Sequence, residues 1–408
     1  MTPRVLKAFS LVFLLVLPGC SEFNRKRPSE QAQQRWNHMR ARVKLQLAER
    51  SFGNGAIDDA LSQCNEVIGL DPEFAEGHVL LTRIHLERGD VSKAQAALSA
   101  AASLAPTAPE VFYLQGLIAE RQGRSQDALK YYQEAYQAQP DEVDYLLTYV
   151  ESLMAADQYD KALEVVLPRR KDFEQTAAVH AVTGQLFSLL GRPVQAAECY
   201  LLAVHLAPKS HLLREEAGAA FVAAGWYEDA AETLNPLVEL PATQASNAHA
   251  GEPSIGAIRN LATALLQTGK VNRAVQVLER ASKKYPDDPS IWILTADAHL
   301  RCGDLEQAAQ AARKAAATAP DQPDIQLLLI YHALQTGLIQ QAIDAAQRMV
   351  DRRPGDVEAR AMLALAWERA PNGIPKAAEQ YRRILSMFPA HRWAQRQLER
   401  LNQQACAP

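Results

Sequence analysis

Apolar residues along most of the chain recur at helical spacing, in short stripes separated by glycine and proline. In the segment 109–142, one stripe ends at Gly123, and a second stripe begins near Ser125 and ends at Pro140. Glycine commonly ends a helix because it adopts a left-handed backbone without steric cost. Proline stops a helix because it lacks an N–H donor and clashes with the preceding turn. The segment therefore predicts two short amphipathic helices joined by a tight turn.

The same pattern recurs with a period of 34 residues. The units begin at Ala41, Ala75, Pro109, Val143, Ala177 and His211, and after an additional stretch at Ile255, Pro289, Pro323 and Val357. Position 20 is alanine in nine of the ten units, position 15 is glycine in eight, position 32 is proline in seven and position 8 is usually small. We expect the small residues to let the two helices of a unit approach closely. A helix pair this short buries its apolar stripes only by stacking on copies of itself.

Helix–turn–helix units of 34 residues with these small-residue, glycine and proline positions resemble tetratricopeptide repeats. The resemblance covers about residues 41–391. It implies an all-α fold, a right-handed superhelical solenoid of about ten helix pairs closed by a C-terminal capping helix. The expected domains are repeats 1–6 at 41–245, a linker or hinge at 246–254, repeats 7–10 at 255–391, and the capping helix and tail at 392–408.

Two repeats deviate from the pattern. The fourth has Asp157 in place of the turn glycine and carries Pro168 inside its second helix, and the sixth carries Pro236 at the same position. We expect these prolines to shorten or kink their helices. The stretch 241–254 after the sixth repeat is polar and rich in alanine, glycine and proline, so it is the candidate hinge.

The N-terminus differs from the repeats and resembles the signal peptide of bacterial lipoproteins over residues 1–19. Arg4 and Lys7 precede an apolar run at 8–17, which is too short to span a bilayer as a stable helix. The run leads into the sequence Leu-Pro-Gly-Cys, which ends at Cys20. The resemblance implies that Cys20 is lipidated and becomes the first residue of the mature chain. An ordinary secretory signal or an uncleaved anchor is the alternative.

Residues 20–40 then comprise the lipidated cysteine, a polar tether and a leading helix that begins near Glu30. Two or three acyl chains would hold the protein stably at a membrane, whereas one chain alone is marginal. By the same resemblance, Ser21 after the cysteine implies the outer membrane. We therefore expect a lipid-anchored protein of the cell envelope that faces the periplasm.

Composition and motifs give no sign of catalysis. The formal net charge is −4, which argues against nucleic acid because that partner requires a basic face. The chain has no phosphate loop, no HExxH, no GxSxG and no CxxC motif. His78, His180 and His85 fall at helix-packing positions, and Cys64 and Cys199 are expected to be buried thiols. We expect no enzymatic activity, no cofactor, no metal and no small-molecule substrate.

A binding surface is what the pattern favours instead. In a first helix, positions 2, 5, 9 and 12 point about 130° away from positions 4, 7, 8 and 11. The resembled family lines its concave groove with the former set, so we expect that set to face away from the packing stripe. The candidate groove residues are Leu45, Val79, Arg83, Tyr113, Leu117, Leu147 and Glu151 in repeats 1–4, and Ile293, Leu327 and Tyr331 in repeats 8 and 9. The alternative is that some of them only pack between neighbouring helices.

The expected function is that of a protein–protein interaction scaffold in envelope assembly, secretion or export. Its groove would hold an extended segment or a helix of a protein partner. The alternative is a component that binds or guides an exopolysaccharide during export. A polymer sleeve requires exposed aromatics and polar ladders in the groove, and Tyr113 and Tyr331 are too few for that role.

Overall fold

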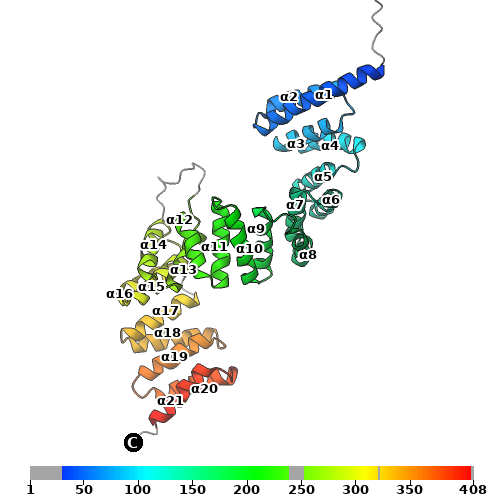
Figure 1. Ribbon diagram of the computed structural model, residues 1–408. Helices are drawn as coiled ribbons and strands as arrows, with labels where there is room; N and C mark the ends of the chain where they lie inside the picture. Colours follow the sequence, from blue (N-terminus) through cyan, green and yellow to red (C-terminus); the bar gives the residue numbers. More distant parts are fainter. Residues whose placement is uncertain (1–29, 239–251, 320–321, 406–408) are drawn as a thin grey trace, which may run out of the picture. The chain divides into compact units, whose positions relative to one another are not determined.

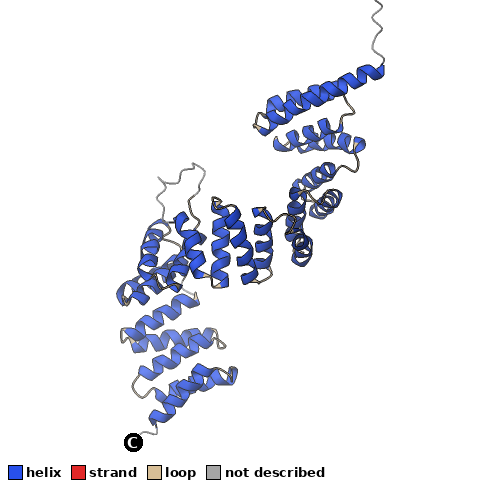
Figure 2. Ribbon diagram, viewed as in Figure 1, coloured by secondary structure: helices blue, strands red, loops and turns tan. Residues whose placement is uncertain are grey.

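The computed structural model describes residues 30–238, 252–319 and 322–405, and this part of the chain is entirely helical (Figures 1 and 2). Cys20, the signal-peptide segment and most of the expected linker at 246–254 lie outside the described residues. The predicted all-α fold of stacked helix pairs is confirmed. Among the described helices, none is long and apolar enough to cross a membrane.

The chain forms two compact units, Met1–Tyr145 and Leu146–Pro408. The helices up to the boundary are α1 Glu30–Gly53, α2 Ile57–Leu70, α3 Ala75–Glu87, α4 Val91–Leu104, α5 Pro109–Arg121, α6 Ser125–Ala138 and α7 Val143–Ala155, in which the boundary falls. Those that follow are α8 Tyr159–Arg169, α9 Ala177–Leu189, α10 Pro193–Leu206, α11 His211–Ala224, α12 Tyr227–Val238, α13 Ile255–Gln267, α14 Val271–Lys284, α15 Pro289–Cys302, α16 Leu305–Thr318, α17 Pro323–Gln335, α18 Ile339–Arg352, α19 Val357–Arg369, α20 Ile374–Met387 and α21 Arg392–Ala405.

The second unit includes the helices on both sides of the expected linker. Helices α12 and α13 pack against each other there, so the sixth and seventh repeats adjoin in the same unit. The backbone N–H of Ser254 donates to the Glu215 carboxylate at 2.9 Å, which joins the start of α13 to α11. A hinge at 246–254 stays a prediction.

The turns within the repeats have the backbone that the glycine pattern predicts. All eight position-15 glycines have a left-handed backbone, with φ between 67° and 80°. In the fourth repeat, Asp157 adopts the same conformation with φ of 56°, and in the tenth, Asn372 does so with φ of 57°. These two residues therefore make the turn in the two repeats that lack the glycine.

Packing within the repeats follows the small-residue pattern. The position-20 alanines, from Ala60 to Ala377, are at most 3% exposed. Tyr132, on the predicted stripe of α6, is also buried, and its hydroxyl donates to the Glu120 carboxylate at 2.7 Å. The short helix α8 has 11 residues and ends one residue after Pro168, as expected for a proline inside a helix. Leu401 of the capping helix α21 is buried in a cluster with Tyr381.

Candidate partner-binding groove

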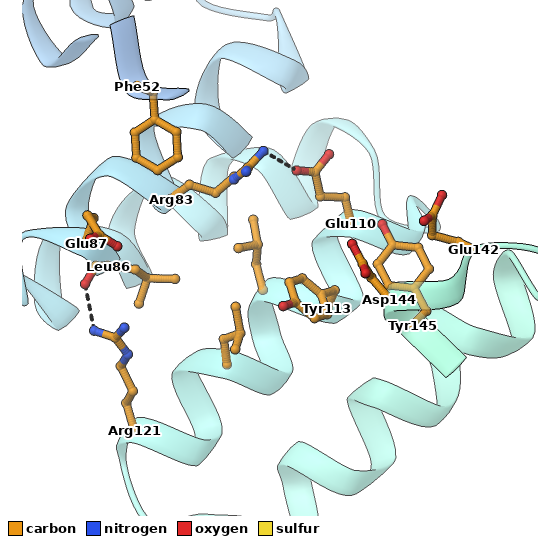
Figure 3. A pocket seen from close by; sticks show the side chains of 12 residues that line it. Phe52, Arg83, Leu86, Glu87, Glu110, Tyr113, Arg121, Glu142, Asp144 and Tyr145 are labelled. Carbon is orange, nitrogen blue, oxygen red and sulfur yellow. Dashed lines mark hydrogen bonds and ion pairs between the residues drawn. The ribbon is translucent and has the colours of Figure 1, made fainter. Parts of the chain in front are cut away.

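A groove of about 430 Å³ lies in the first unit, on the side formed by the first helices of successive repeats. It is bounded by the end of α1, by α3 and α5, and by the first residues of α7 (Figure 3). The lining residues are Phe52, Arg83, Leu86, Glu87, Glu110, Tyr113, Leu114, Leu117, Arg121, Glu142, Asp144 and Tyr145. Many of them occupy positions 2, 5, 9 and 12 of their repeats, which share one side of a first helix because of the helical period.

Aromatic rings stand on both sides of the groove. The Tyr113 and Tyr145 rings are half-buried, with centroids 5.5 Å apart and planes inclined by 45°. Tyr113 also contacts the buried Tyr132, at 6.0 Å between centroids, which anchors it to the core of its repeat. On the other side, the Arg83 guanidinium lies 5.3 Å from the centre of the Phe52 ring. The groove thus offers large apolar surfaces that carry polar tips.

Acidic groups outnumber basic ones in the groove. Four carboxylates, on Glu87, Glu110, Glu142 and Asp144, accompany two guanidinium groups. Both guanidinium groups have partners within the groove, because Arg83 Nη1 is 3.5 Å from Glu110 Oε1 and Arg121 Nη1 donates to the Leu86 carbonyl at 2.6 Å (Figure 3). With four carboxylates against two guanidinium groups, the lining has an excess of negative charge.

The titration of two side chains reflects this environment. Burial raises the pKa of Tyr145 to about 12, and the carboxylates of Glu110 and Glu142 add to that shift. Burial also raises the pKa of Glu110, and it outweighs the opposing attraction of Arg83. Desolvation and like charge both disfavour a negative group, and a cation that enters the groove would oppose them through its attraction for the carboxylates.

The structure brings together three of the residues that the sequence predicts for the groove, namely Arg83, Tyr113 and Leu117. Leu45 and Val79 are only 7% and 9% exposed and belong to apolar clusters between neighbouring helices. The expectation that position 5 faces away from the packing stripe is wrong for these two residues. For them, the alternative of packing between helices describes the structure.

The other five predicted residues lie in the second unit. Leu147, Ile293 and Leu327 are half-buried, whereas Glu151 and Tyr331 are exposed. Their binding role stays a prediction.

Sequence reasoning missed most of the acidic and aromatic residues of the groove. Glu110 and Asp144 occupy position 2, and Phe52 and Leu86 occupy position 12, so the helical period already placed them on the groove side. Tyr145 is at position 3, just beside that stripe. A scan of positions 2 and 12, in addition to 5 and 9, would have found four of these five residues.

Three of the residues that the sequence assigns to helix packing, His180, Cys64 and Cys199, are buried in the structure. His180 is buried, and its Nε2 lies 2.9 Å from the Glu174 carbonyl. Cys64 and Cys199 are buried free thiols, and burial raises the pKa of Cys64 to about 12. Over the described ranges, no three His, Cys, Asp or Glu side chains are grouped so that they could hold a metal ion.

Comparison with solved structures finds other repeat proteins. The TPR domain of P58(IPK) is 15% identical over 90% of this chain and 99% of its own length, with a TM-score of 0.38. Pseudomonas aeruginosa pilF is 14% identical over 62% of this chain and 95% of its own, with a TM-score of 0.41. A tetratricopeptide repeat protein from Parabacteroides merdae is 20% identical over 63% of this chain and 98% of its own, with a TM-score of 0.40. No curated protein matches the chain.

Two family models, both described as tetratricopeptide repeat, match the sequence in several overlapping places. One matches residues 45–109, 79–143 and 259–323, and the other matches residues 119–186 and 299–366. The matches fall on both sides of the expected linker and together span more than half of the chain. Proteins built from this repeat generally mediate protein–protein interaction. The chain therefore belongs to the tetratricopeptide repeat family.

Proposed function

We propose that this protein is a non-catalytic interaction scaffold of the cell envelope, and that its groove holds an extended protein segment that carries basic side chains. The observation that carries the proposal is the groove itself, where the Tyr113–Tyr145 pair lies beside the carboxylates of Glu110, Glu142 and Asp144. An extended segment fits because the groove runs across the first helices of successive repeats.

The preference for basic side chains follows from the charges and rings of the groove. A lysine or arginine head group binds favourably over a tyrosine face and beside carboxylates. Tyrosine is also enriched at binding hot spots, because it combines a large apolar body with a polar tip. The four carboxylates of the lining outnumber the guanidinium groups of Arg83 and Arg121, so the groove as a whole has an excess of negative charge.

The envelope location rests on the N-terminal sequence. The basic start, the apolar run at 8–17 and Cys20 support lipid attachment and a place at the outer membrane, facing the periplasm. Cys20→Ala should abolish the incorporation of a radioactive fatty acid, because the thiol is the acyl acceptor. Label retained by that variant would contradict the anchor without bearing on the groove.

The scaffold proposal can be tested by photo-crosslinking in cells. A photoreactive amino acid at position 117, in the groove, should capture a protein through a segment rich in lysine or arginine. The matched control is the same amino acid at position 126, because Gln126 is exposed at the start of α6 and does not line the groove. Capture of the same proteins from both positions, or captured segments without basic residues, would overturn the proposal.

A further inference from the structure

We propose that the outer face of α1 lies on a lipid surface that contains anionic lipids. The inference rests on the proposed membrane location, deepens it, and does not involve the groove. It starts from four large apolar side chains on α1 that are more than half exposed. They are Trp36 at 57%, Met39 at 63%, Val43 at 63% and Leu47 at 51%.

These side chains form one stripe along the helix. Their spacings of three, four and four residues keep them within a narrow sector at 100° per residue. The buried residues of α1, namely Ala41, Leu45 and Ala48, fall on the opposite side. That inner side already packs on α2 and α3, so the stripe has no role in the core of the repeat. A contiguous exposed apolar surface of this kind marks an interaction site.

Basic side chains flank the stripe. Arg35, Arg40 and Arg42 are exposed on its two sides, and α1 contains five arginine and lysine residues against two glutamates. The whole chain carries a formal net charge of −4, so the basic excess is local to this helix. An apolar stripe with basic flanks is typical of a helix that lies in the plane of a membrane interface. Tryptophan is the side chain that such interfaces favour.

The position of α1 in the chain favours a lipid surface as the partner of the exposed stripe. The segment that precedes it contains the apolar run at 8–17 and the basic residues Arg25, Lys26 and Arg27. Only nine residues lie between Cys20 and Glu30, so an anchor at Cys20 would hold α1 within roughly 35 Å of the membrane surface. That tether is short enough for α1 to reach the surface, where anionic headgroups attract basic side chains within a Debye length, roughly 8–10 Å, and the attraction falls with added salt.

The experiment measures the depth of Trp36 in the full chain bound to vesicles. The vesicles contain phosphatidylcholine and phosphatidylglycerol, with or without bromine atoms on the acyl chains, which quench tryptophan fluorescence. The fluorescence difference between wild type and Trp36→Phe isolates residue 36 from the other tryptophans. We expect the brominated lipids to remove most of that difference. We also expect quenching to weaken in high salt and in vesicles of phosphatidylcholine alone.

A pair of variants separates the stripe from the anchor. Val43→Asp with Leu47→Asp should restore most of the Trp36 fluorescence, whereas Leu212→Asp should not, because Leu212 is 70% exposed on α11 and lies outside the stripe. All the substituted side chains are exposed, and unchanged melting of each variant would show that the fold is intact. Vesicle binding without quenching of Trp36 would overturn the inference while leaving the anchor standing. Shielding of Trp36 that depends on protein concentration in the absence of lipid would also overturn it, since a second copy would then cover the stripe.

Discussion

The ring of Tyr132 fills the space that a side chain at Gly116 would need. A Cβ atom at position 116 would lie 2.3 Å from Cε1 of Tyr132, far inside van der Waals contact. The same pairing of repeat positions 8 and 24 recurs at Gly184 with Tyr200 and at Gly218 with Leu234. The ninth repeat reverses the sizes, with Ile330 at position 8 and Ala346 at position 24 in one apolar cluster.

Gly116→Ala should therefore destabilise the protein by about 1–3 kcal/mol, as overpacking of a core typically does. The Tyr132 ring cannot easily move aside, because it is buried and its hydroxyl bonds to Glu120. Gly69→Ala in α2 is the control, since a Cβ atom there would meet nothing within 4 Å. It should be neutral or stabilising by up to about 1 kcal/mol. Urea denaturation measures both, and equal effects would contradict the pairing.

The turn of the fourth repeat offers a second test of the backbone. Asp157 has a left-handed conformation, which costs a residue with a Cβ atom more than it costs glycine. Asp157→Gly should stabilise the protein by about 0.5–1 kcal/mol. The gain is reduced by the loss of the exposed hydrogen bond that the Tyr159 hydroxyl donates to the Asp157 carboxylate. Asp157→Ala should be less stable than Asp157→Gly. Thermal unfolding of the two variants gives the order, and the opposite order would argue against strain at this turn.

The pKa of Tyr145 predicts a stability change at high pH. Its pKa is raised to about 12 in the folded protein from an ordinary value of 10, mainly by burial. A raised pKa means that the folded state holds the proton more tightly, so the stabilisation is complete below pH 10 and is lost between about pH 10 and 12. Tyr145→Phe should make the fall in melting temperature over that range shallower than in wild type. Identical slopes would mean that the Tyr145 hydroxyl titrates at its ordinary pH.

Much of the fold could be predicted because its determinants are local. A glycine at a turn, a proline after a helix and an alanine between two helices each act within one repeat, and the period of 34 makes them visible. The two turns without glycine show the limit of the pattern, because Asp157 and Asn372 supply the same backbone with a different residue type.

The groove was less predictable, because a helical wheel gives the direction of a side chain but not the depth at which it lies. Leu45, Val79 and Tyr113 share position 5, yet the first two are buried against neighbouring helices and only Tyr113 lines the groove. Leu45 and Val79 belong to apolar clusters that include residues of the neighbouring helices. The acidic character of the groove was also hidden, because its carboxylates come from α3, α5, the turn before α7 and α7 itself.

Tyr113→Ala should weaken capture of the partner by about 2 kcal/mol or more, the loss expected for a tyrosine hot spot. Because the Tyr113 ring also contacts Tyr132, the variant should lose some thermal stability as well. Tyr132→Phe is the control, because Tyr132 is buried and does not line the groove. This change should lower stability and leave binding of the partner unchanged. The measurement is a pull-down from solubilised membranes with wild type and the two variants, at a temperature at which all three proteins are folded. Unchanged capture by folded Tyr113→Ala would remove Tyr113 from the binding site.

The most direct test of the scaffold account is the affinity of the groove for the segment that is crosslinked at position 117. Titration calorimetry should compare wild type with the double variant Glu142→Gln and Asp144→Asn, which removes negative charge and keeps side-chain size. We expect the double variant to bind at least about tenfold more weakly, because charge-assisted contacts contribute roughly 1.5–3 kcal/mol each. Its binding should also depend less on salt than that of wild type. Equal affinity and equal salt dependence in the two proteins would contradict the claim that this groove recognises a basic segment of a protein partner.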